Sequence, residues 1–215
     1  EVYDPESGHW EDGQGLATPR SRHTATLLSS GEVLVVGGLT ETGTLAERGE
    51  VYDPAGDSWR PTGPLARALM GHTATLLRSG KVVAVGGTVD GVSPLGVTQT
   101  YDPTDGRWSM DTSLTTARFG HTATLMPSGE VLVVGGQADG APLSSAEVRD
   151  PETGSWSKVR GSMGNARFGH TSTLLPSGEV LVTGGNSMRG AYLESTELYE
   201  PVLGAWRGTE ALKAA

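Results

Sequence analysis

The chain has 215 residues, a formal net charge of −9 and no cysteine. The negative charge argues against a nucleic-acid surface, which needs a basic stripe, and against an anionic membrane surface. No apolar run approaches the roughly 20 residues that span a bilayer, and the lack of cysteine excludes disulfides, thiolate metal sites and cysteine nucleophiles. The compartment stays open, with secretion or the cell surface favoured.

A motif that begins His-Thr-Ala-Thr at His23 returns every 49 residues. A fixed period along the whole chain predicts a repeat array. We therefore expect one domain over residues 1–215, in which a half repeat is followed by four full repeats. Their ranges are 1–19 for the half repeat and 20–68, 69–117, 118–166 and 167–215 for the full repeats. Because the chain opens on Glu1 and not on Met, we expect a processed chain or an excerpt of a longer one.

Each full repeat carries four strand signals, which the first repeat illustrates. The β-branched alternation after His23 predicts a strand, and a Ser-Gly turn follows it. The second strand, 33–36, is apolar on both faces, so it must be covered on both sides; it ends in a double glycine that allows close backbone approach. The third strand, 50–53, leads through an Asp-Pro turn to a fourth strand that begins at Trp59.

No segment shows a sustained helical period, so we predict almost no helix. Four antiparallel strands per repeat, none able to bury both faces alone, are typical of a propeller blade. One tryptophan and usually one tyrosine recur at fixed places and are interpreted as blade packing. Arg149 stands where the third full repeat would have that tyrosine, and the sequence gives no reason for it.

The repeats resemble Kelch repeats in their double glycine, in the Tyr ahead of the Asp-Pro turn, and in the Trp six residues after that Asp. The period of about 50 residues also fits. The resemblance implies an all-β, Kelch-type β-propeller with four complete four-stranded blades, an N-terminal half blade over 1–19, and the first strand of each blade innermost. The family includes scaffold and recognition proteins, sialic-acid mutarotases and copper-radical oxidases. The oxidase chemistry needs a cysteine and is excluded.

Kelch-like rings usually have about six or seven blades, more than this chain supplies. The N-terminal half repeat provides only the third and fourth strands of a fifth blade, and the C-terminal end aligns with a linker. We therefore expect an excerpt of a larger propeller, or a ring that a second chain completes.

Four histidines share one place in the repeat, near the channel axis if the first strand is innermost. A ring of four imidazoles is able to hold iron, copper or zinc. The favoured interpretation is that each makes the same structural hydrogen bond within its own blade, so no metal and no cofactor is predicted. These residues are His23, His72, His121 and His170.

Arginines occupy the linker before the first strand, at the end of the blade that also carries the divergent loops. A ring of arginines is able to grip a carboxylate or phosphate in forked geometry; the alternative is that each bridges to the neighbouring blade. Apolar residues follow the same linker, and the richest loop runs over 186–192. The predicted ligand-binding residues are Arg20, Arg22, Arg67, Arg118, Arg167, Met70, Phe119, Phe168, Arg189 and Tyr192.

The sequence predicts a recognition or scaffold module that binds a protein segment or a small anionic ligand with this face, because the blades are nearly identical and the loops diverge. No nucleic-acid or membrane partner is expected. The alternative is an enzyme acting on sugar acids, in which axial arginines hold the acid. No catalytic residue is predicted, because no acid–base constellation outside the repeat pattern is present.

Overall fold

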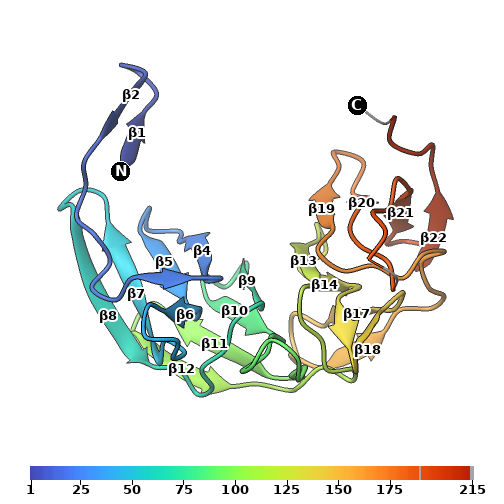
Figure 1. Cartoon of the computed structure of the whole chain (residues 1–215), viewed down its shortest axis with the longest axis horizontal. Coiled ribbons are helices and arrows are strands. Elements are labelled where there is room, and N and C mark those ends of the chain that lie inside the picture. The colour runs from blue at the N-terminus through green and yellow to red at the C-terminus, as the bar shows by residue number, and fades with distance from the viewer. Residues whose placement is uncertain (189, 214–215) are drawn as a thin grey trace.

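The computed structural model describes residues 1–188 and 190–213. Within these ranges the chain consists of β-strands, turns and loops, without helix, as the sequence predicts. No helix long and apolar enough to cross a membrane is therefore found in this part of the chain. The sheets follow one another along an arc, with an N-terminal hairpin at one end and the last sheet at the other (Figure 1).

Four antiparallel sheets of four strands form the body of the molecule, one for each full repeat. Sheet 1 contains β4 (Thr24–Leu27), β5 (Val33–Val36), β7 (Arg48–Asp53) and β8 (Ser58–Pro64). Sheet 2 contains β9 (Thr73–Leu76), β10 (Val82–Val85), β11 (Thr98–Asp102) and β12 (Arg107–Met110). Sheet 3 contains β13 (Thr122–Leu125), β14 (Val131–Val134), β17 (Ala146–Arg149) and β18 (Trp156–Lys158). Sheet 4 contains β19 (Thr171–Leu174), β20 (Val180–Thr183), β21 (Thr196–Glu200) and β22 (Ala205–Gly208).

Three smaller pairings complete the structure. The predicted half repeat is a hairpin of β1 (Val2–Asp4) and β2 (His9–Glu11), exposed along most of its length. The sequence did not predict the other two: β3 (Arg20–Ser21) with β6 (Leu39–Thr40), and β15 (Gln137–Ala138) with β16 (Ala141–Pro142). Both involve the loop that follows the double glycine, which is where the repeats diverge.

The same register recurs in all four sheets. The first threonine of the inner strand pairs with the last residue of the second strand, as in Thr73 with Val85 and Thr122 with Val134. The turn between these strands contains a glycine with φ between +83° and +92° in every copy, a conformation that favours glycine. Repeated local sequence thus produces four nearly equivalent sheets.

A separate hydrophobic core lies at each of the three junctions between consecutive sheets. Strands β10 and β14 are buried along their whole length, because their alternate side chains enter the cores on their two sides. Val82 packs in the core with sheet 1, for example, and Val83 in the core with sheet 3. This confirms that the doubly apolar second strand is covered on both faces.

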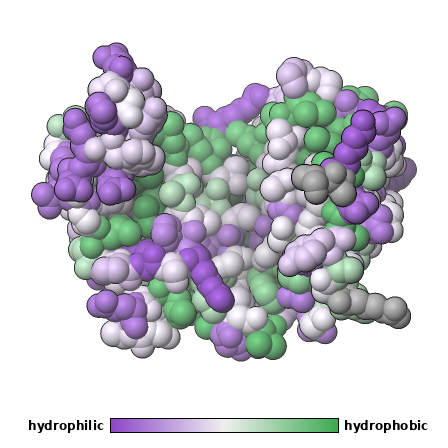
Figure 2. Space-filling view, turned by 45° about the horizontal axis from the view of Figure 1, so that its top comes forward, coloured by the Kyte–Doolittle hydropathy of each residue, from purple (hydrophilic) through white to green (hydrophobic). Residues whose placement is uncertain are grey.

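The inner strands β4, β9, β13 and β19 face the concave side of the arc (Figure 1). Neighbouring inner strands contact one another from sheet to sheet. At the two ends of the arc this contact is made on one side only, and the inner strand of sheet 4 is correspondingly more exposed than those of sheets 2 and 3. Apolar side chains lie on the concave surface between the two ends (Figure 2).

Candidate functional site: the end of the sheets that carries linkers and loops

The linker before each inner strand and the loop after each double glycine lie at the same end of their sheet. Backbone hydrogen bonds join them: Met70 and Thr88 exchange two, of 3.0 and 2.9 Å, and Phe119 and Gln137 exchange two, of 3.2 and 2.8 Å. The linkers also meet one another, because the Gly120 N–H donates to Gly71 O and the Gly169 N–H to Gly120 O. These contacts place the linkers and loops, with the described predicted site residues that they carry, at the same end of each sheet along the arc.

Arg118 lies in the linker to sheet 3 and is fully buried. Its guanidinium donates to the backbone oxygens of Gly135 and Ser145 at 2.8 and 3.0 Å, and to Glu147 Oε1 at 2.8 Å. The Glu147 carboxylate also accepts the backbone N–H groups of two linker residues at 2.7 and 2.9 Å. Burial lowers the pKa of Arg118 while Glu147 opposes that shift, and arginine stays protonated at any ordinary pH. The ion pair therefore fastens the linker to the third strand of its sheet.

Arg167 and Arg20 repeat this arrangement in sheets 4 and 1. Arg167 donates to Glu197 Oε1 at 2.8 Å, and Arg20 donates to Glu50 Oε1 at 2.5 Å. In all three cases the arginine side chain is at most 1% exposed, and its hydrogen-bonding N–H groups are directed to protein oxygens. The guanidinium binds the sheet that follows the linker, whereas the backbone N–H and carbonyl of Arg118 and of Arg167 bond the sheet before it. These two residues therefore join neighbouring sheets. A ligand would have to displace a buried ion pair to reach these arginines.

In sheet 2 the linker is attached to the third strand by uncharged residues. Leu69, fully buried, takes the place of the arginine, and Gln99 takes the place of the glutamate. The Gln99 amide donates to the Arg67 carbonyl at 2.9 Å and accepts the Arg67 backbone N–H at 3.1 Å. The side chain of Arg67 is exposed, so this predicted site residue remains accessible to a ligand.

Arg22 has an unusual backbone. Its φ is +57°, in the left-handed region, where the three other repeats place Gly71, Gly120 and Gly169 with φ between +60° and +63°. A non-glycine residue there is strained. The Arg22 side chain is exposed, and within residues 1–188 and 190–213 it has no hydrogen-bond or ion-pair partner. Arg22, like Arg67, thus presents a guanidinium without a partner among the described residues.

The remaining predicted contact residues differ in exposure. Met70 is buried at 5% exposure, while Phe119 and Phe168 are half-buried under the loops. Tyr192 is 86% exposed on the loop that follows β20. Arg189, from the same loop, lies outside the described residues.

The repeat histidines link neighbouring sheets. His72 Nε2 lies 2.9 Å from Thr24 Oγ1 of the preceding sheet, and His121 and His170 make the same bond, at 3.0 Å, to the next threonines along the series. The expected hydrogen bond within the histidine's own blade is therefore wrong: the bond crosses the junction. His23 is exposed, and the described residues contain no group of three or more side chains that is arranged to hold a metal ion.

Burial keeps these histidines neutral. The pKa of His72 and that of His121 are lowered to about 3, and that of His170 to about 4, chiefly because a charged imidazole would lose its hydration. The ring of His121 sits against the first glycine of the preceding double glycine: a Cβ on Gly86 would come within 2.6 Å of its Cε1. The first glycine is thus required by the linker carbonyl and the imidazole of the next repeat, whereas the second, Gly87, faces Met70 O and His72 of its own repeat.

Sequence reasoning missed the partners of these side chains. Glu50, Glu147 and Glu197 were not considered, although each stands two residues ahead of the tyrosine position and becomes Gln99 in the repeat where the linker arginine becomes Leu69. That joint replacement was a readable signal of contact. Arg149, by contrast, pairs with Asp111 of sheet 2 at 2.5 Å, a contact that no pattern in the sequence indicates.

Comparison with known families identifies one of the repeats. Residues 118–163 match the family model of the Kelch motif. This range comprises the linker arginine and all four strands of sheet 3. The chain carries a Kelch motif. No curated protein matches the chain closely enough to serve as a relative. The Kelch motif, together with the all-β architecture, agrees with the resemblance read from the repeat, and Kelch motifs are typical of protein-interaction scaffolds.

Proposed function

We propose that this chain is a protein-interaction scaffold whose contact surface is the end that carries the linkers and divergent loops. The skeleton of the four sheets is nearly constant, while the loops that follow the double glycines differ in sequence and in secondary structure. Variable loops on a constant scaffold are the usual basis of recognition. The partner would be a protein segment or a small anionic ligand that meets the exposed Arg22 and Arg67, and Tyr192 on the last loop.

Arg22 is the observation that carries this proposal. A left-handed arginine costs folding free energy of the order of 1 kcal/mol relative to the glycine that three repeats use at the same place. Backbone strain of this kind is retained where the side chain has a function other than stabilising the fold. The exposed guanidinium offers forked hydrogen bonds suited to a carboxylate. Arg20, Arg118 and Arg167 support the linkers instead and are removed from the proposed set of contact residues, as is the buried Met70.

The test is the substitution R22G. Removal of the strain should raise the midpoint of thermal unfolding, whereas loss of the guanidinium should weaken binding of an acidic probe peptide, such as acetyl-Glu-Gly-Glu-Gly-Glu-amide, by about tenfold. Amide chemical shifts measured by NMR during the titration report both affinity and location. R107A, which removes an exposed arginine from β12, is the matched control. Equal affinity of R22G, R107A and the unaltered chain would sink the proposal for this face.

We also propose that residues 1–215 form one domain in which the sheets are consecutive propeller blades and the two ends of the arc receive further units. In sheet 4, Thr171 occupies the place of the threonines that bond the next histidine, and a Cβ on Gly184 would find only Leu193 O, at 3.6 Å. At the other end His23 is exposed. A further unit, from a longer chain or a second one, would supply the missing imidazole and hydroxyl. An experimental structure of this chain in which Thr171 and His23 bond each other would contradict this.

The enzyme alternative receives no support from the site. It requires a ring of arginines free to hold a sugar acid, and Arg118 and Arg167 are engaged by buried glutamates.

A further inference from the structure

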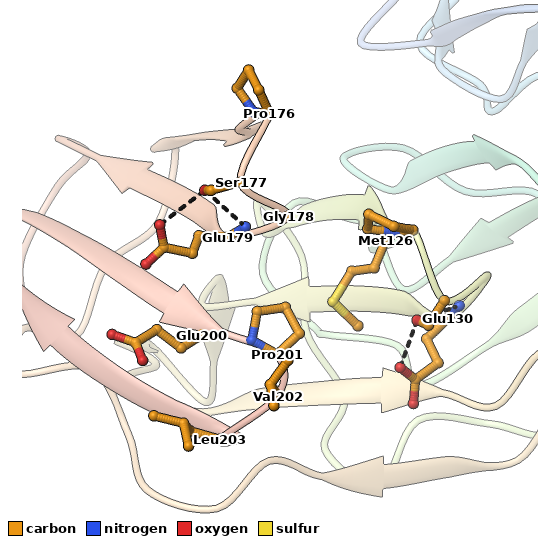
Figure 3. Close-up of a pocket in the computed structure, with 12 residues that line it drawn as sticks. Met126, Glu130, Pro176, Ser177, Gly178, Glu179, Glu200, Pro201, Val202 and Leu203 are labelled. Carbon is orange, nitrogen blue, oxygen red and sulfur yellow. Dashed lines mark hydrogen bonds between the residues drawn. The ribbon is translucent and has the colours of Figure 1, made fainter.

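The second surface with unusual properties lies at the opposite end of the sheets, where the tight turns are. A hollow of about 730 Å³ opens between sheets 3 and 4, bordered by the β13–β14, β19–β20 and β21–β22 turns (Figure 3). Prolines and aliphatic side chains form much of its wall, with carboxylates at the border. The residues that shape it include Met126, Pro127, Glu130, Pro176, Val202 and Leu203.

The corresponding place between sheets 2 and 3 is filled. Arg78, at the first position of the β9–β10 turn, extends across that junction, and its guanidinium donates to Pro127 O of sheet 3. Its Cδ would lie 3.5 Å from a Cβ on Gly129, so the aliphatic stem packs against the facing turn. The protein thus contains its own example of an arginine bound at this kind of junction.

Between sheets 3 and 4 the arginine is replaced by Pro127, whose Cγ lies 3.8 Å from where a Cβ on Gly178 would be. The short proline ring leaves the space that the guanidinium of Arg78 occupies one junction earlier. The carbonyl equivalent to Pro127 O is Pro176 O, and no side chain of the described residues donates to it. An acceptor and a vacant space therefore remain together at this junction.

The charge at the hollow favours a cation. Glu32 and Glu179, at the equivalent turn position in sheets 1 and 4, pair with Arg60 and Arg207. In sheet 3 the residue after the tryptophan is Ser157, so Glu130 has no ion-pair partner in the described part of the chain; its carboxylate accepts only the Ser128 hydroxyl, at 2.7 Å. Three carboxylates thus surround the hollow, those of Glu130, Glu179 and Glu200, against the one guanidinium of Arg207.

The rim of the hollow is also apolar where the other repeats are polar or small. Val202 is 98% exposed and Leu203 69% exposed on the β21–β22 turn. The same two turn positions hold Ala55 and Gly56 in sheet 1, and Thr, Asp or Glu in sheets 2 and 3. Two adjacent exposed aliphatic side chains next to an unpaired carboxylate suit an amphipathic ligand.

We propose that this hollow is a docking site for an arginine side chain of a partner protein, in a segment where an aliphatic residue adjoins the arginine. The guanidinium donates to Pro176 O and to the Glu130 carboxylate, and its stem lies against Gly178 as that of Arg78 lies against Gly129. The neighbouring aliphatic residue covers Val202 and Leu203. The proposal rests on the scaffold function, but it uses the end of the sheets that the linkers and loops do not occupy.

The probe is the peptide acetyl-Gly-Leu-Arg-Leu-Gly-amide, with citrulline in place of arginine as the uncharged control. Saturable shifts of the Gly178 and Glu130 amide signals in NMR titrations are expected with the arginine peptide, and affinity at least fivefold weaker with the citrulline peptide. E130Q should weaken the arginine peptide by about tenfold, because a charge-assisted hydrogen bond is lost. E152Q, which removes an exposed carboxylate from the β17–β18 turn, should leave affinity unchanged.

P127R provides an independent test, since it places in sheet 3 the residue that fills the preceding junction. The new side chain should occupy the hollow from within and abolish peptide binding while the thermal midpoint is kept or raised. Equal binding of the arginine and citrulline peptides, full binding by P127R, or no binding to the unaltered chain would each overturn the proposal. None of these outcomes bears on the scaffold function itself, because the acidic peptide test at Arg22 involves no residue of the hollow.

Discussion

Sheets 2 and 3 have the same strand order and the same register, yet different side chains attach the linker to the third strand in each. Sheet 3 uses a buried ion pair, Arg118 with Glu147, and sheet 2 uses Leu69 with Gln99. Both partners change together, so at this place in the four sheets the described residues contain neither a buried glutamate without its arginine nor a buried arginine without its glutamate. The comparison teaches that the ion pair is one solution to a local requirement, the attachment of a linker to the third strand, and that the requirement can be met by a neutral pair.

The largest expected effect comes from breaking one partner alone. R118L leaves the Glu147 carboxylate buried with only its two backbone donors, and loss of one partner of a buried pair costs about 3–5 kcal/mol. The free energy of unfolding, measured by urea denaturation, should fall by that amount. R107L, on exposed β12, should change it by less than about 0.5 kcal/mol. A fall of under about 1 kcal/mol in R118L would show that the pair is not important for sheet 3.

A smaller effect for each residue is expected from the protonation of a junction histidine, and it should be similar in sheets 2 and 3 because both have that histidine. The pKa of His72 and that of His121 lie at about 3 in the folded chain and near 6.5 in the unfolded chain. The unfolded chain therefore binds more protons below pH 6.5, so stability falls as the pH drops from about 6.5 towards 3. The slope is at most about 1.4 kcal/mol per pH unit for each histidine.

Urea denaturation between pH 7 and pH 5 checks this expectation. H72Q and H121Q should each reduce the slope by a similar amount, because glutamine does not titrate. A stability that stays constant over this range in the unaltered chain, or a slope that persists unchanged in both variants, would contradict the assignment of neutral histidines at the junctions.

The smallest effect should follow from exchanging both partners. The double variant R118L/E147Q gives sheet 3 the residues of sheet 2, and replacement of a buried ion pair by a neutral, well-packed pair is often nearly neutral. We expect a free energy of unfolding within about 1 kcal/mol of that of the unaltered chain. In a double-mutant cycle with R118L and E147Q, most of the single-variant losses should then cancel. A double variant as unstable as R118L would mean that the two sheets close their linkers in ways that cannot be exchanged.

The fold was largely predictable because its causes are local. Alternating Thr-Ala-Thr, the Ser-Gly turn and the Asp-Pro turn act within a few residues, and the period of 49 residues repeats them. The short pairs β3–β6 and β15–β16 escaped prediction because they form in divergent loops without such a pattern.

The site was less predictable because it depends on which side chains meet. Arg118 and Glu147 are 29 residues apart in sequence, and only the register of sheet 3 brings them together. The sequence named buried arginines such as Arg118 and exposed ones such as Arg22 together as ligand-binding residues. Only the fold separates the two kinds and shows the left-handed φ of Arg22. The hollow beside Pro127 likewise depends on knowing that this turn position faces the next sheet, where Arg78 reaches its neighbour.

The bond from His72, His121 and His170 to a threonine of the preceding sheet has a further consequence. Every sheet offers its neighbour the same atoms that it receives from the sheet before it, namely a hydroxyl, a glycine and the N–H of the second glycine, which donates to the linker carbonyl at 2.8–2.9 Å in all three junctions. Such an interface fixes the angle between successive units but not how many there are. Duplication or loss of a whole 49-residue segment would therefore preserve each remaining contact, which lets an array of this type change length in evolution by single genetic steps.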